Sequence, residues 1–586
     1  MFEFRHVSVV SFLVCLLMAD AWAERPNILV ILSDDQGFGD LARHGNKVVE
    51  TPRLDQLFAE SFELTQFHAA PVCAPTRASL MTGKQFLRTG VWGVHGGRDY
   101  LDLRETTVVE RLQKSGYRTA MAGKWHLGKT DAYMPYNRGF DEAWPIVDRL
   151  YMHTDPVIDH NGEIERPRGW TVDILTDYLL DWMDNGDDRP FFAYLAHPYI
   201  HEPYYAPELL IEKYRKKGLS DSFARLCAMT EHLDQATGRL IDALEERGLS
   251  GNTVVFFLGD NGPIGNPVNV PHLTKNEMAS RNPLGLKGVK GNLYENGTRV
   301  PFMVRWPEVF EAKVSNNEAD ITDVVPTLLD LVGIDYSEED FDGRSLTPLF
   351  KGDVEKLNTL VRYYANHEVI WPGRKRLYDF LEDRNVLSFE DQVLSLRAGD
   401  LKYVMGFGNR ELYNIAHDPR ESENLVSLYP EKSKKLHNQL REWWETNVFS
   451  DSKSYSMPVF PLPSQTGRSM LLHPCAPSEI FGNVVQGSHF SHQWKSSGDG
   501  IGFAIKVANS GDYQVKIDAD IEERTGELLV SVSDEMVQIS LENSDSGNMG
   551  TMSIPKGEHR LLVKLVGVEG DSVKIENLKA VHLTRL

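Results

Sequence analysis

The stretch NILVILSDDQGFGD, residues 27–40, joins a short apolar run to an acidic cluster that follows it directly. Three more short apolar runs occur later: FFAYLA (191–196), TVVFFL (253–258) and VPFMVRW (300–306). Amphipathic helical patterns lie between them, at 105–115, 171–184 and 223–247. Alternating apolar runs and helices are typical of parallel strands buried between two helical layers. The sequence therefore predicts an α/β fold whose sheet has helices on both faces.

Acidic and amide side chains follow two of these predicted strands. Asp34 and Asp35 come after the first strand, and Asp260 and Asn261 come after TVVFFL. A lone pair of this kind often only caps a helix or closes a turn. Two parallel strands would bring all four oxygen donors to one edge of the sheet, where ligands bind in α/β folds. Oxygen ligands favour Ca²⁺, or alternatively Mg²⁺, over zinc.

The pattern changes towards the C-terminus of the 586-residue chain, which is long enough for several domains. We expect an α/β domain over 24–360, followed over 361–449 by a small subdomain with an antiparallel sheet and a helix. Residues 450–469 are rich in Ser and Pro and are predicted to be a linker. Strand patterns separated by turns predict a β-sandwich over 470–586.

The N-terminal segment 1–23 is predicted to be a cleaved signal peptide, because a charged start precedes an apolar run and the ending AWA. A retained N-terminal anchor is the alternative. We expect the chain to be secreted or periplasmic without a membrane anchor, since no other stretch is apolar and long enough to cross a bilayer.

Charge and cysteine content narrow the function. The formal net charge of −22 argues against nucleic acid or anionic membranes as partners, so an anionic substrate would need a local cationic pocket. Once the predicted signal is removed, Cys73, Cys227 and Cys475 remain, a set too sparse and odd for a disulfide framework. The helical pattern around Cys227 predicts a buried thiol. Cys73, in AAPVCAPTRASLMTGK (69–84), needs a different explanation.

Basic side chains cluster in three further segments. Their sequences are AGKWHLGK with Lys124 and His126, HPYIHEPYYAP with His197 and His201, and LKGVKGNLYENGTRVP with Lys287 and Lys290. Each segment alone is a weak signal, because a lysine is usually solvated and a histidine in a Pro-rich turn is usually structural. Together they could form a cationic cradle for a tetrahedral anion beside a metal.

The motif CAPTRASLMTGK resembles the signature of type I sulfatases, members of the alkaline-phosphatase superfamily. Other segments resemble blocks of that family in the family's order: RPNILVILSDDQGFGD, GKWHLG, RGFD, FFLGDNGP, YENGTRVPFMVRWP, FDGRSLTPLF and ELYNIAHDPRESENL. The resemblance covers roughly 24–446 and omits the C-terminal β-region. It implies an alkaline-phosphatase-like mixed sheet sandwiched by helices.

The resemblance also implies that Cys73 is a precursor. In the family, a formylglycine-generating enzyme oxidises this cysteine to Cα-formylglycine. One hydroxyl of the hydrated aldehyde attacks sulfur, and the other loses a proton so that sulfate leaves by C–O cleavage. Sulfate monoesters hydrolyse very slowly unaided, so a large barrier must be lowered. Release of sulfate by C–O cleavage avoids a second attack on sulfur.

Residue roles carried over from the family are likewise expectations. The cation would be bound by Asp34, Asp35, Asp260, Asn261 and position 73, with Asp260 also the base for the attacking hydroxyl. Arg77 and Lys124 would hold the hydrate, and His126 would take the proton of its second hydroxyl. Lys124, His201 and Lys290 would bind the sulfate, and the last two would protonate the leaving oxygen. His201 is chosen over His197, and Lys290 over Lys287, by their spacing to family motifs.

The substrate is less defined. Loop 90–102 offers Trp92, His95, Arg98 and Tyr100 as candidate contacts, and loops 262–285 and 366–380 are further candidates. The β-region loosely resembles carbohydrate-binding sandwiches, and a plain packing domain is the alternative. A secreted sulfatase with such an appendage favours a sulfated carbohydrate or polysaccharide as substrate.

Two other functions remain open. The first is a phosphonate or phosphate monoester hydrolase of the same superfamily. The second is a non-catalytic glycan-binding relative, which predicts a loss among Cys73, Arg77, Asp260 or His126. All four residues are present.

Overall fold

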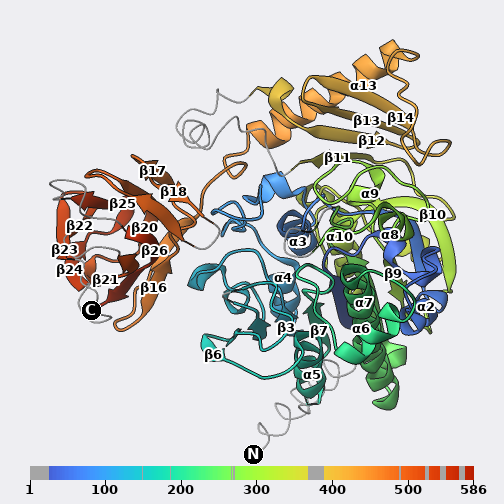
Figure 1. Ribbon diagram of the computed structural model, residues 1–586, viewed down its shortest axis with the longest axis horizontal. Coiled ribbons are helices and arrows are strands. Elements are labelled where there is room, and N and C mark those ends of the chain that lie inside the picture. Colours follow the sequence, from blue (N-terminus) through green and yellow to red (C-terminus); the bar gives the residue numbers. More distant parts are fainter. Residues whose placement is uncertain are drawn as a thin grey trace, which may run out of the picture.

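The computed structural model describes residues 25–586 except 148, 185–186, 266, 268–270, 367–387, 488–489, 522–526, 541–548 and 567–574. The predicted signal peptide therefore lies outside the described residues, as does most of loop 366–380. Figure 1 shows a large α/β body, a small sheet with one helix beside it at the top, and a β-sandwich on the left.

The α/β body is built on one eight-stranded sheet with strand order β10-β2-β9-β8-β1-β7-β3-β4. β1 lies near its centre and pairs in parallel with both β7 and β8. The strand bounds are β1 Asn27–Ser33, β2 Phe62–His68, β3 Arg118–Gly123, β4 Glu142–Pro145, β7 Phe191–Ala196, β8 Thr253–Gly259, β9 Phe302–Arg305 and β10 Lys313–Asp320. A separate hairpin joins β5 Ile158–His160 to β6 Glu163–Glu165.

Helices cover both faces of this sheet, as the sequence predicts. Ile28, Val30 and Leu32 of β1 belong to the apolar core that includes α3, α4 and α10, whereas Leu29 and Ile31 belong to the core that includes α2, α5 and α7. The described helices are α2 Pro52–Ala59, α3 Cys73–Thr82, α4 Val108–Lys114, α5 Thr171–Met183, α6 Glu208–Arg215, α7 Asp221–Glu246, α8 Lys275–Ser280, α9 Glu295–Thr298, α10 Val324–Leu331, α11 Thr347–Phe350 and α13 Pro430–Trp443.

One predicted parallel strand is antiparallel. β9, within VPFMVRW, runs antiparallel to both β8 and β2. The connection from β8 returns at the same end of the sheet, where Leu258 pairs with Phe302. β9 must then run back, because only a crossover to the opposite end would make it parallel. The sheet is therefore mixed.

The small subdomain has a four-stranded antiparallel sheet. Its strands are β11 Val361–Ala365, β12 Leu394–Ala398, β13 Leu401–Gly406 and β14 Asn409–Asn414. Leu396 and Tyr403 of this sheet and Leu440 of α13 belong to the same apolar core as the first face of the large sheet. The subdomain is thus packed firmly on the α/β body.

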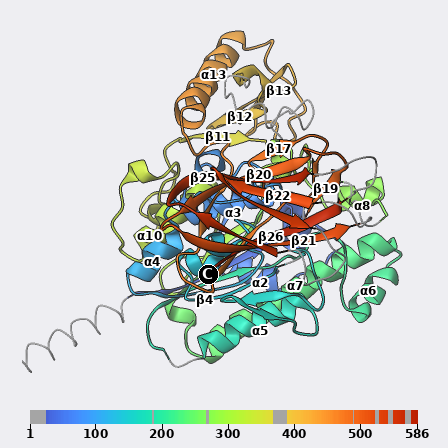
Figure 2. The same ribbon diagram turned by 90° about the vertical axis from the view of Figure 1, so that its left-hand side faces the viewer.

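The C-terminal β-region forms two facing sheets around a core of its own. One sheet contains β15 Val459–Leu462, β17 Glu479–Phe481, β20 Gly500–Val507, β22 Glu527–Val532, β23 Glu535–Ser540 and β25 Gly557–Val566. The other contains β16 Ser469–Leu472, β18 Val485–Gln486, β19 Ser491–Trp494, β21 Gly511–Ile521, β24 Met549–Ile554 and β26 Ile575–Arg585. Figure 2, which faces this region, shows it lying in front of the α/β body.

The segment predicted as a linker contributes to this sandwich. β15, inside 450–469, pairs with β20 because Phe460 and Leu462 insert into the sandwich core. The α/β body contacts this connection and the sandwich. Trp92 Nε1 donates to the Ser456 carbonyl at 2.9 Å, and Tyr133 Oη donates to the Val459 carbonyl at 2.9 Å. In the sandwich, Gln486 Nε2 donates to the Gly96 carbonyl at 3.0 Å.

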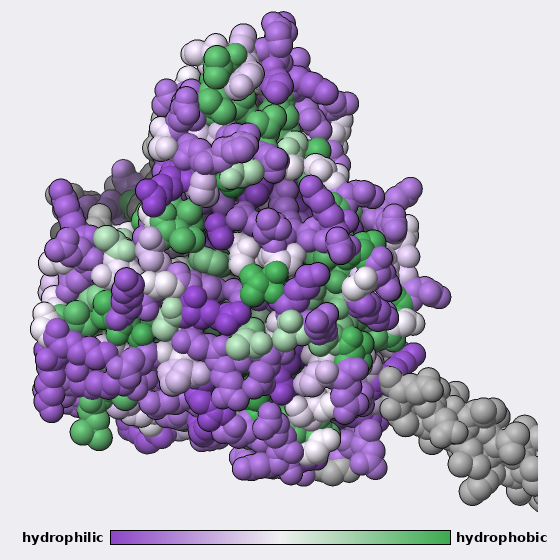
Figure 3. Space-filling model, turned by 90° about the vertical axis from the view of Figure 1, so that its right-hand side faces the viewer, coloured by the Kyte–Doolittle hydropathy of each residue, from purple (hydrophilic) through white to green (hydrophobic). Residues whose placement is uncertain are grey.

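The surface and helices add two observations. The face in Figure 3 is mainly hydrophilic, with hydrophobic residues in separate small groups. Among the described residues, no helix has both the length and the apolar character needed to cross a bilayer.

Candidate active site

The strand register brings the predicted acidic cluster together. Ser33 lies opposite Gly259 in the β1–β8 pair, so the chain leaves both strands at the same level. The Asp35 backbone N–H donates to Asp260 Oδ1 at 3.1 Å, and Asn261 Nδ2 donates to Asp35 Oδ1 at 2.7 Å. All four predicted donors, Asp34, Asp35, Asp260 and Asn261, are buried at this edge.

Helix α3 presents Cys73 and Arg77 to this edge. Cys73 is the first residue of the helix, and Arg77 lies four positions later on the same face. Arg77 Nη2 is 2.9 Å from Asp260 Oδ2 and 3.5 Å from Asp34 Oδ2, and its Nη1 donates to the Lys124 carbonyl at 2.6 Å. The ligand atoms of Asp34, Cys73 and Asp260 all lie within 4.8 Å of one another.

The segment that follows β3 contributes Lys124 and His126. Lys124 Nζ is 2.5 Å from Asp34 Oδ2. His126 Nδ1 is 3.4 Å from Cys73 Sγ, and its Nε2 is 2.8 Å from the Val94 carbonyl oxygen. Because a carbonyl only accepts, Nε2 must carry the proton, and the Nδ1 lone pair of the neutral ring faces Cys73.

His201 and Lys290 approach the cluster from the opposite side. Lys290 Nζ is 2.6 Å from Asp35 Oδ1, and His201 Nε2 is 3.5 Å from Asp35 Oδ2. His201 Nδ1 donates to the Glu202 carbonyl at 2.6 Å. Tyr151 stacks on the His201 ring with centroids 3.8 Å apart, and Lys124 Nζ lies 4.5 Å from the Tyr151 ring centroid.

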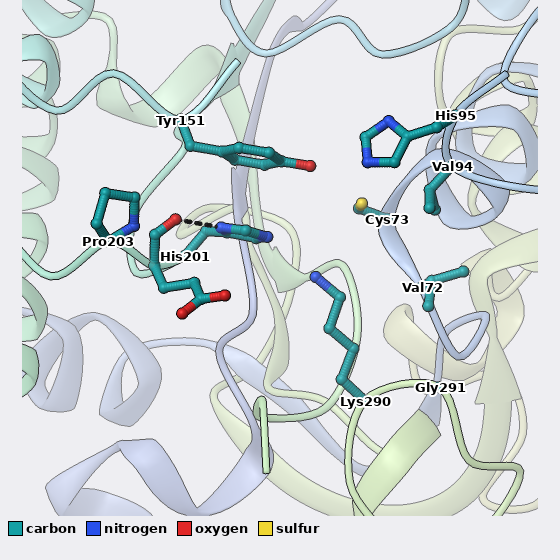
Figure 4. Close-up of a pocket in the computed structure, with 10 residues that line it drawn as sticks. Val72, Cys73, Val94, His95, Tyr151, His201, Pro203, Lys290 and Gly291 are labelled. Carbon is teal, nitrogen blue, oxygen red and sulfur yellow. Dashed lines mark hydrogen bonds between the residues drawn. The ribbon is translucent and has the colours of Figure 1, made fainter. Parts of the chain in front are cut away.

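These groups border a pocket of about 460 Å³. Figure 4 shows Lys290 and the stacked pair of Tyr151 and His201 facing Cys73 and His95 across it. A pocket of this size holds one sugar-sized ligand and not a folded partner. Cys73 therefore lies where a small polar substrate can reach it.

The buried donors fit a divalent cation. Among the described residues, Asp34 Oδ1, Asp35 Oδ2 and Asn261 Oδ1 have no hydrogen-bond partner, although all three atoms are buried. Orphaned buried oxygens are costly unless a ligand satisfies them. An all-oxygen set is typical of Ca²⁺ or Mg²⁺. The chemistry and burial of these atoms thus agree with a cation at this edge.

Burial and neighbouring charges set the protonation of the site. Burial alone would raise the pKa of Asp34, but the charges of Lys124, Arg77 and Lys290 hold it well below its usual range. Burial and the nearby Asp34 charge raise the pKa of Asp260.

The basic residues divide into charged and neutral groups. Burial would lower the pKa of Lys290, but Asp35 raises it on balance, so Lys290 is a cation. Burial lowers the pKa of His126 and brings that of His201 to about 4, so both rings are neutral at neutral pH.

Of the candidate substrate contacts in loop 90–102, only His95 lines the pocket among the described residues. Trp92 and Tyr100 are buried in apolar cores and cannot contact a substrate in the pocket. His95 lines the pocket, whereas Arg98 supports it by donating from Nε to the His95 carbonyl. Lys287 Nζ points to Tyr413 Oη and Glu411 instead of the pocket.

The remaining sequence-level expectations concern His197, loop 262–285 and the cysteines. His197 is fully buried and is not among the described residues that line the pocket. Loop 262–285 is described only in part, and none of its described residues lines the pocket. Cys73, Cys227 and Cys475 are all unpaired and buried.

The structure adds two polar residues to the pocket lining that the sequence did not predict, Tyr151 and Glu202. Tyr151 lies in the loop after β4, in the segment RLYMHTDP, which resembles no motif used above. Glu202 follows His201 and lines the same pocket. The sequence carries a signal for Glu202, because this acidic residue directly follows the predicted site residue His201.

The chain is similar to known proteins in sequence and in fold. A family model described as Sulfatase matches residues 26–334, and one described as N-sulphoglucosamine sulphohydrolase, C-terminal, matches 289–446. Arylsulfatase A of Homo sapiens is 31% identical over 463 residues, covering 71% of this chain and 86% of that protein.

Two solved structures have a similar fold. The structure of Ps i-CgsB with k-i-k-neocarrahexaose has a TM-score of 0.63 and 22% identity, covering 74% of this chain and 95% of that one. The structure of BT4656 with D-glucosamine-2-N,6-O-disulfate has a TM-score of 0.56 and 20% identity, covering 74% of this chain and 100% of that one.

Proposed function

The chain belongs to the sulfatase family and is a sulfuric ester hydrolase, and from this premise we propose that it removes sulfate from a sulfated saccharide outside the cytoplasm, using formylglycine made from Cys73. The observation that carries the proposal is the position of Cys73 Sγ. It lies within 4.8 Å of ligand atoms of Asp34 and Asp260 and faces the lone pair of His126. In the mature enzyme, oxygens of the modified side chain would occupy the place of this sulfur.

The modified residue and the cation supply chemistry that no unmodified side chain here has. A hydrated formylglycine supplies an attacking hydroxyl and a way to release sulfate by C–O cleavage, and a bound Ca²⁺ or Mg²⁺ supplies positive charge for the sulfate oxygens. Asp34, Asp35, Asp260 and Asn261, together with position 73, would hold the cation.

The protein's own side chains position the reacting groups. Arg77 bridges Asp260, Asp34 and the Lys124 carbonyl, and so keeps a fixed positive charge beside position 73. We assign Asp260 as the base for the attacking hydroxyl. His126 would accept the proton of the second hydroxyl, because its Nδ1 lone pair already faces position 73.

The proton for the leaving oxygen is assigned to Lys290. His201 donates its Nδ1 proton to the Glu202 carbonyl, so its neutral ring turns a lone pair towards Asp35 and has no proton to give. Lys290 stays charged beside Asp35 and borders the pocket. The lone pair of His201 would then accept a hydrogen bond only from a donor such as an ammonium or a hydroxyl group, with Tyr151 fixing the plane of its ring.

Two observations support a sulfated saccharide as the substrate: the residues that line the pocket, and the ligands of two structural neighbours. Tyr151 offers an aromatic edge, and His95 and Glu202 offer polar atoms for hydroxyl groups. Two structural neighbours were solved with carbohydrate ligands, one an oligosaccharide and the other a glucosamine disulfate. The predicted signal segment supports secretion or a periplasmic location.

The first test is the mass of the tryptic peptide 54–77 from protein secreted by its native host. Conversion of Cys73 to formylglycine lowers the mass by about 18 Da. Release of inorganic sulfate from sulfated oligosaccharides should accompany that loss, with Cys73→Ala as the inactive control. A plain thiol in fully secreted protein would overturn the mechanism. A faster reaction with matched phosphate or phosphonate esters would instead favour the other hydrolase of the superfamily.

A further inference from the structure

A second cavity lies between the α/β body and the sandwich. Its volume is about 630 Å³, and none of its lining residues is shared with the pocket at Cys73. The segment around Trp125 and the loop after β4 form one wall, and Leu471, His473 and Lys579 of the sandwich form the other. Figure 2 shows the sandwich packed over the α/β body on this side of the molecule.

The cavity is basic in an acidic protein. Lys129, Arg149, His473 and Lys579 line it, and none of its described lining residues is acidic. The whole chain has a formal net charge of −22, so a lining whose described residues include no acid departs from the average surface. Lys579 is paired with Asp520, whereas the described residues offer the exposed Arg149 no acidic partner. Such a concentration of positive charge attracts an anion.

The rest of the lining is apolar and partly aromatic. Met134, Ile146, Leu150 and Leu471 contribute aliphatic surface, and Phe490 is 38% exposed at the rim. Phe490 also lines a neighbouring hollow of about 300 Å³ on the sandwich, beside His492 and Lys495. A pyranose ring presents an apolar CH face, and its charged substituents project from the edge. An aromatic and aliphatic floor with basic groups around it matches both features.

We propose that this cavity binds a sugar unit carrying sulfate or carboxylate groups, as a second glycan site formed jointly by the α/β body and the sandwich. The inference goes beyond the proposed function, because binding here requires no turnover. His126 connects this cavity with the pocket at Cys73. Its Nδ1 faces Cys73, and the residue also lines the cavity. An extended chain bound here would be held close to the site of cleavage.

The test is calorimetric binding by the full chain with Cys73→Ala, in the presence of Ca²⁺, so that no probe is consumed. The probes are k-i-k-neocarrahexaose, a hexamer of galacturonate, uncharged maltohexaose and decyl sulfate. Arg149→Glu should weaken binding of the sulfated hexasaccharide at least tenfold and flatten its salt dependence. Lys351→Glu, an exposed lysine outside the cavity, should change it less than twofold.

The pattern of probe binding decides whether the cavity is a glycan site. Binding of both anionic hexasaccharides, or of only one, supports the site and identifies the charged group it prefers. An unchanged affinity in Arg149→Glu overturns the proposal, and so does binding of decyl sulfate alone, which would indicate a site for amphiphiles.

Activity separates this proposal from the proposed function. In enzyme that lacks the Cys73→Ala change and whose Cys73 has been converted to formylglycine, the loss caused by Arg149→Glu should be at least tenfold greater on the hexasaccharide than on 4-nitrophenyl sulfate. If converted enzyme hydrolyses no sulfate ester at all, the proposed function fails, and the calorimetric result still stands.

Discussion

Replacing Lys290 by methionine tests the assignment of the leaving-group acid. The side chain keeps its length and apolar stem but loses the ammonium that lies 2.6 Å from Asp35 Oδ1 and borders the pocket. General acid catalysis contributes about 10²–10⁴ to a rate. The variant should therefore lose about 3–5 kcal/mol of transition-state stabilisation on a saccharide sulfate.

Lys287→Met provides the matched control. Lys287 lies three residues earlier in the same loop, but its Nζ contacts Tyr413 Oη at 2.8 Å and Glu411 at 3.4 Å, away from the pocket. Its side chain is 35% exposed, so the ion pair should contribute at most about 1 kcal/mol of stability. Its kcat/KM should stay within a few-fold of the unchanged enzyme.

The assay is kcat/KM on two substrates that differ in their leaving group. A saccharide alkoxide needs a proton, whereas 4-nitrophenolate leaves readily without one. The Lys290→Met defect should therefore be at least tenfold larger on the saccharide sulfate than on 4-nitrophenyl sulfate. Equal losses on both would refute the acid role and leave Lys290 as a sulfate-binding charge. Cation content is measured in parallel, because Lys290 also contacts Asp35.

Three further predictions concern the cation, pH and the sandwich. Chelation of divalent cations should lower the thermal midpoint reversibly, and Asn261→Ala should shrink that shift; an unchanged midpoint would argue against the cation site. Burial lowers the pKa of His197 from 6.5 to about 3 in the folded protein. As pH falls, the unfolded chain therefore binds a proton at this residue before the folded protein does, and stability falls between about pH 6.5 and pH 3. His197→Gln should reduce that slope by up to about 1.4 kcal/mol per pH unit in denaturant unfolding at pH 5 and 7, and an identical slope would contradict the reasoning. Phe460→Ala should lower the free energy of unfolding by about 3–5 kcal/mol, since the ring is fully buried near Tyr100 and Tyr133. Phe407→Ala is the control and should lower it little, because that residue is 72% exposed. Equal losses of stability would be evidence against the sandwich core as described.

Local sequence pattern accounts for much of the fold because buried strands have a recognisable composition. NILVIL and TVVFFL predict their strands, and the acidic residues that follow predict one edge of the sheet. The strand pairing that puts Ser33 opposite Gly259 is a long-range property, and no local pattern determines it. The direction of β9 was missed for the same reason, since it depends on where the preceding connection returns.

The candidate site is built from segments that lie far apart in the chain. Cys73, Lys124, His201 and Lys290 come from four such segments, and spacing alone gives no reason to group them. Positive charge suggested a common cradle for the three basic residues, and the family resemblance added Cys73. The geometry places the side chains of Cys73, His201 and Lys290 around one pocket. Lys124 does not line the pocket, and it contacts Asp34 and the Tyr151 ring. Tyr151 lay outside every quoted motif and emerged only from the fold.

Aromatic residues in loop 90–102 were misjudged for a physical reason. A glycine-rich loop after a helix usually faces solvent, which made Trp92 and Tyr100 look available to a substrate. The sandwich and its connection cover them instead: Trp92 donates to the Ser456 carbonyl, and Tyr100 packs on Phe460. Because Ser456 lies 364 positions after Trp92, the loop's own sequence carries no signal of this burial.

The charges at the sheet edge explain how so acidic a chain can accept an anionic ester. Arg77, Lys124 and Lys290 interleave with Asp34, Asp35 and Asp260 through direct contacts, and Glu202 adds a further acid to the pocket lining. Without a metal, acids outnumber these bases by one. Burial and the Asp34 charge raise the pKa of Asp260, so Asp260 is the acid that would hold a compensating proton. A divalent cation would replace that proton and leave one net positive charge, which matches the single negative charge of a sulfate monoester. Cation binding, proton release and substrate affinity should therefore be linked in this site.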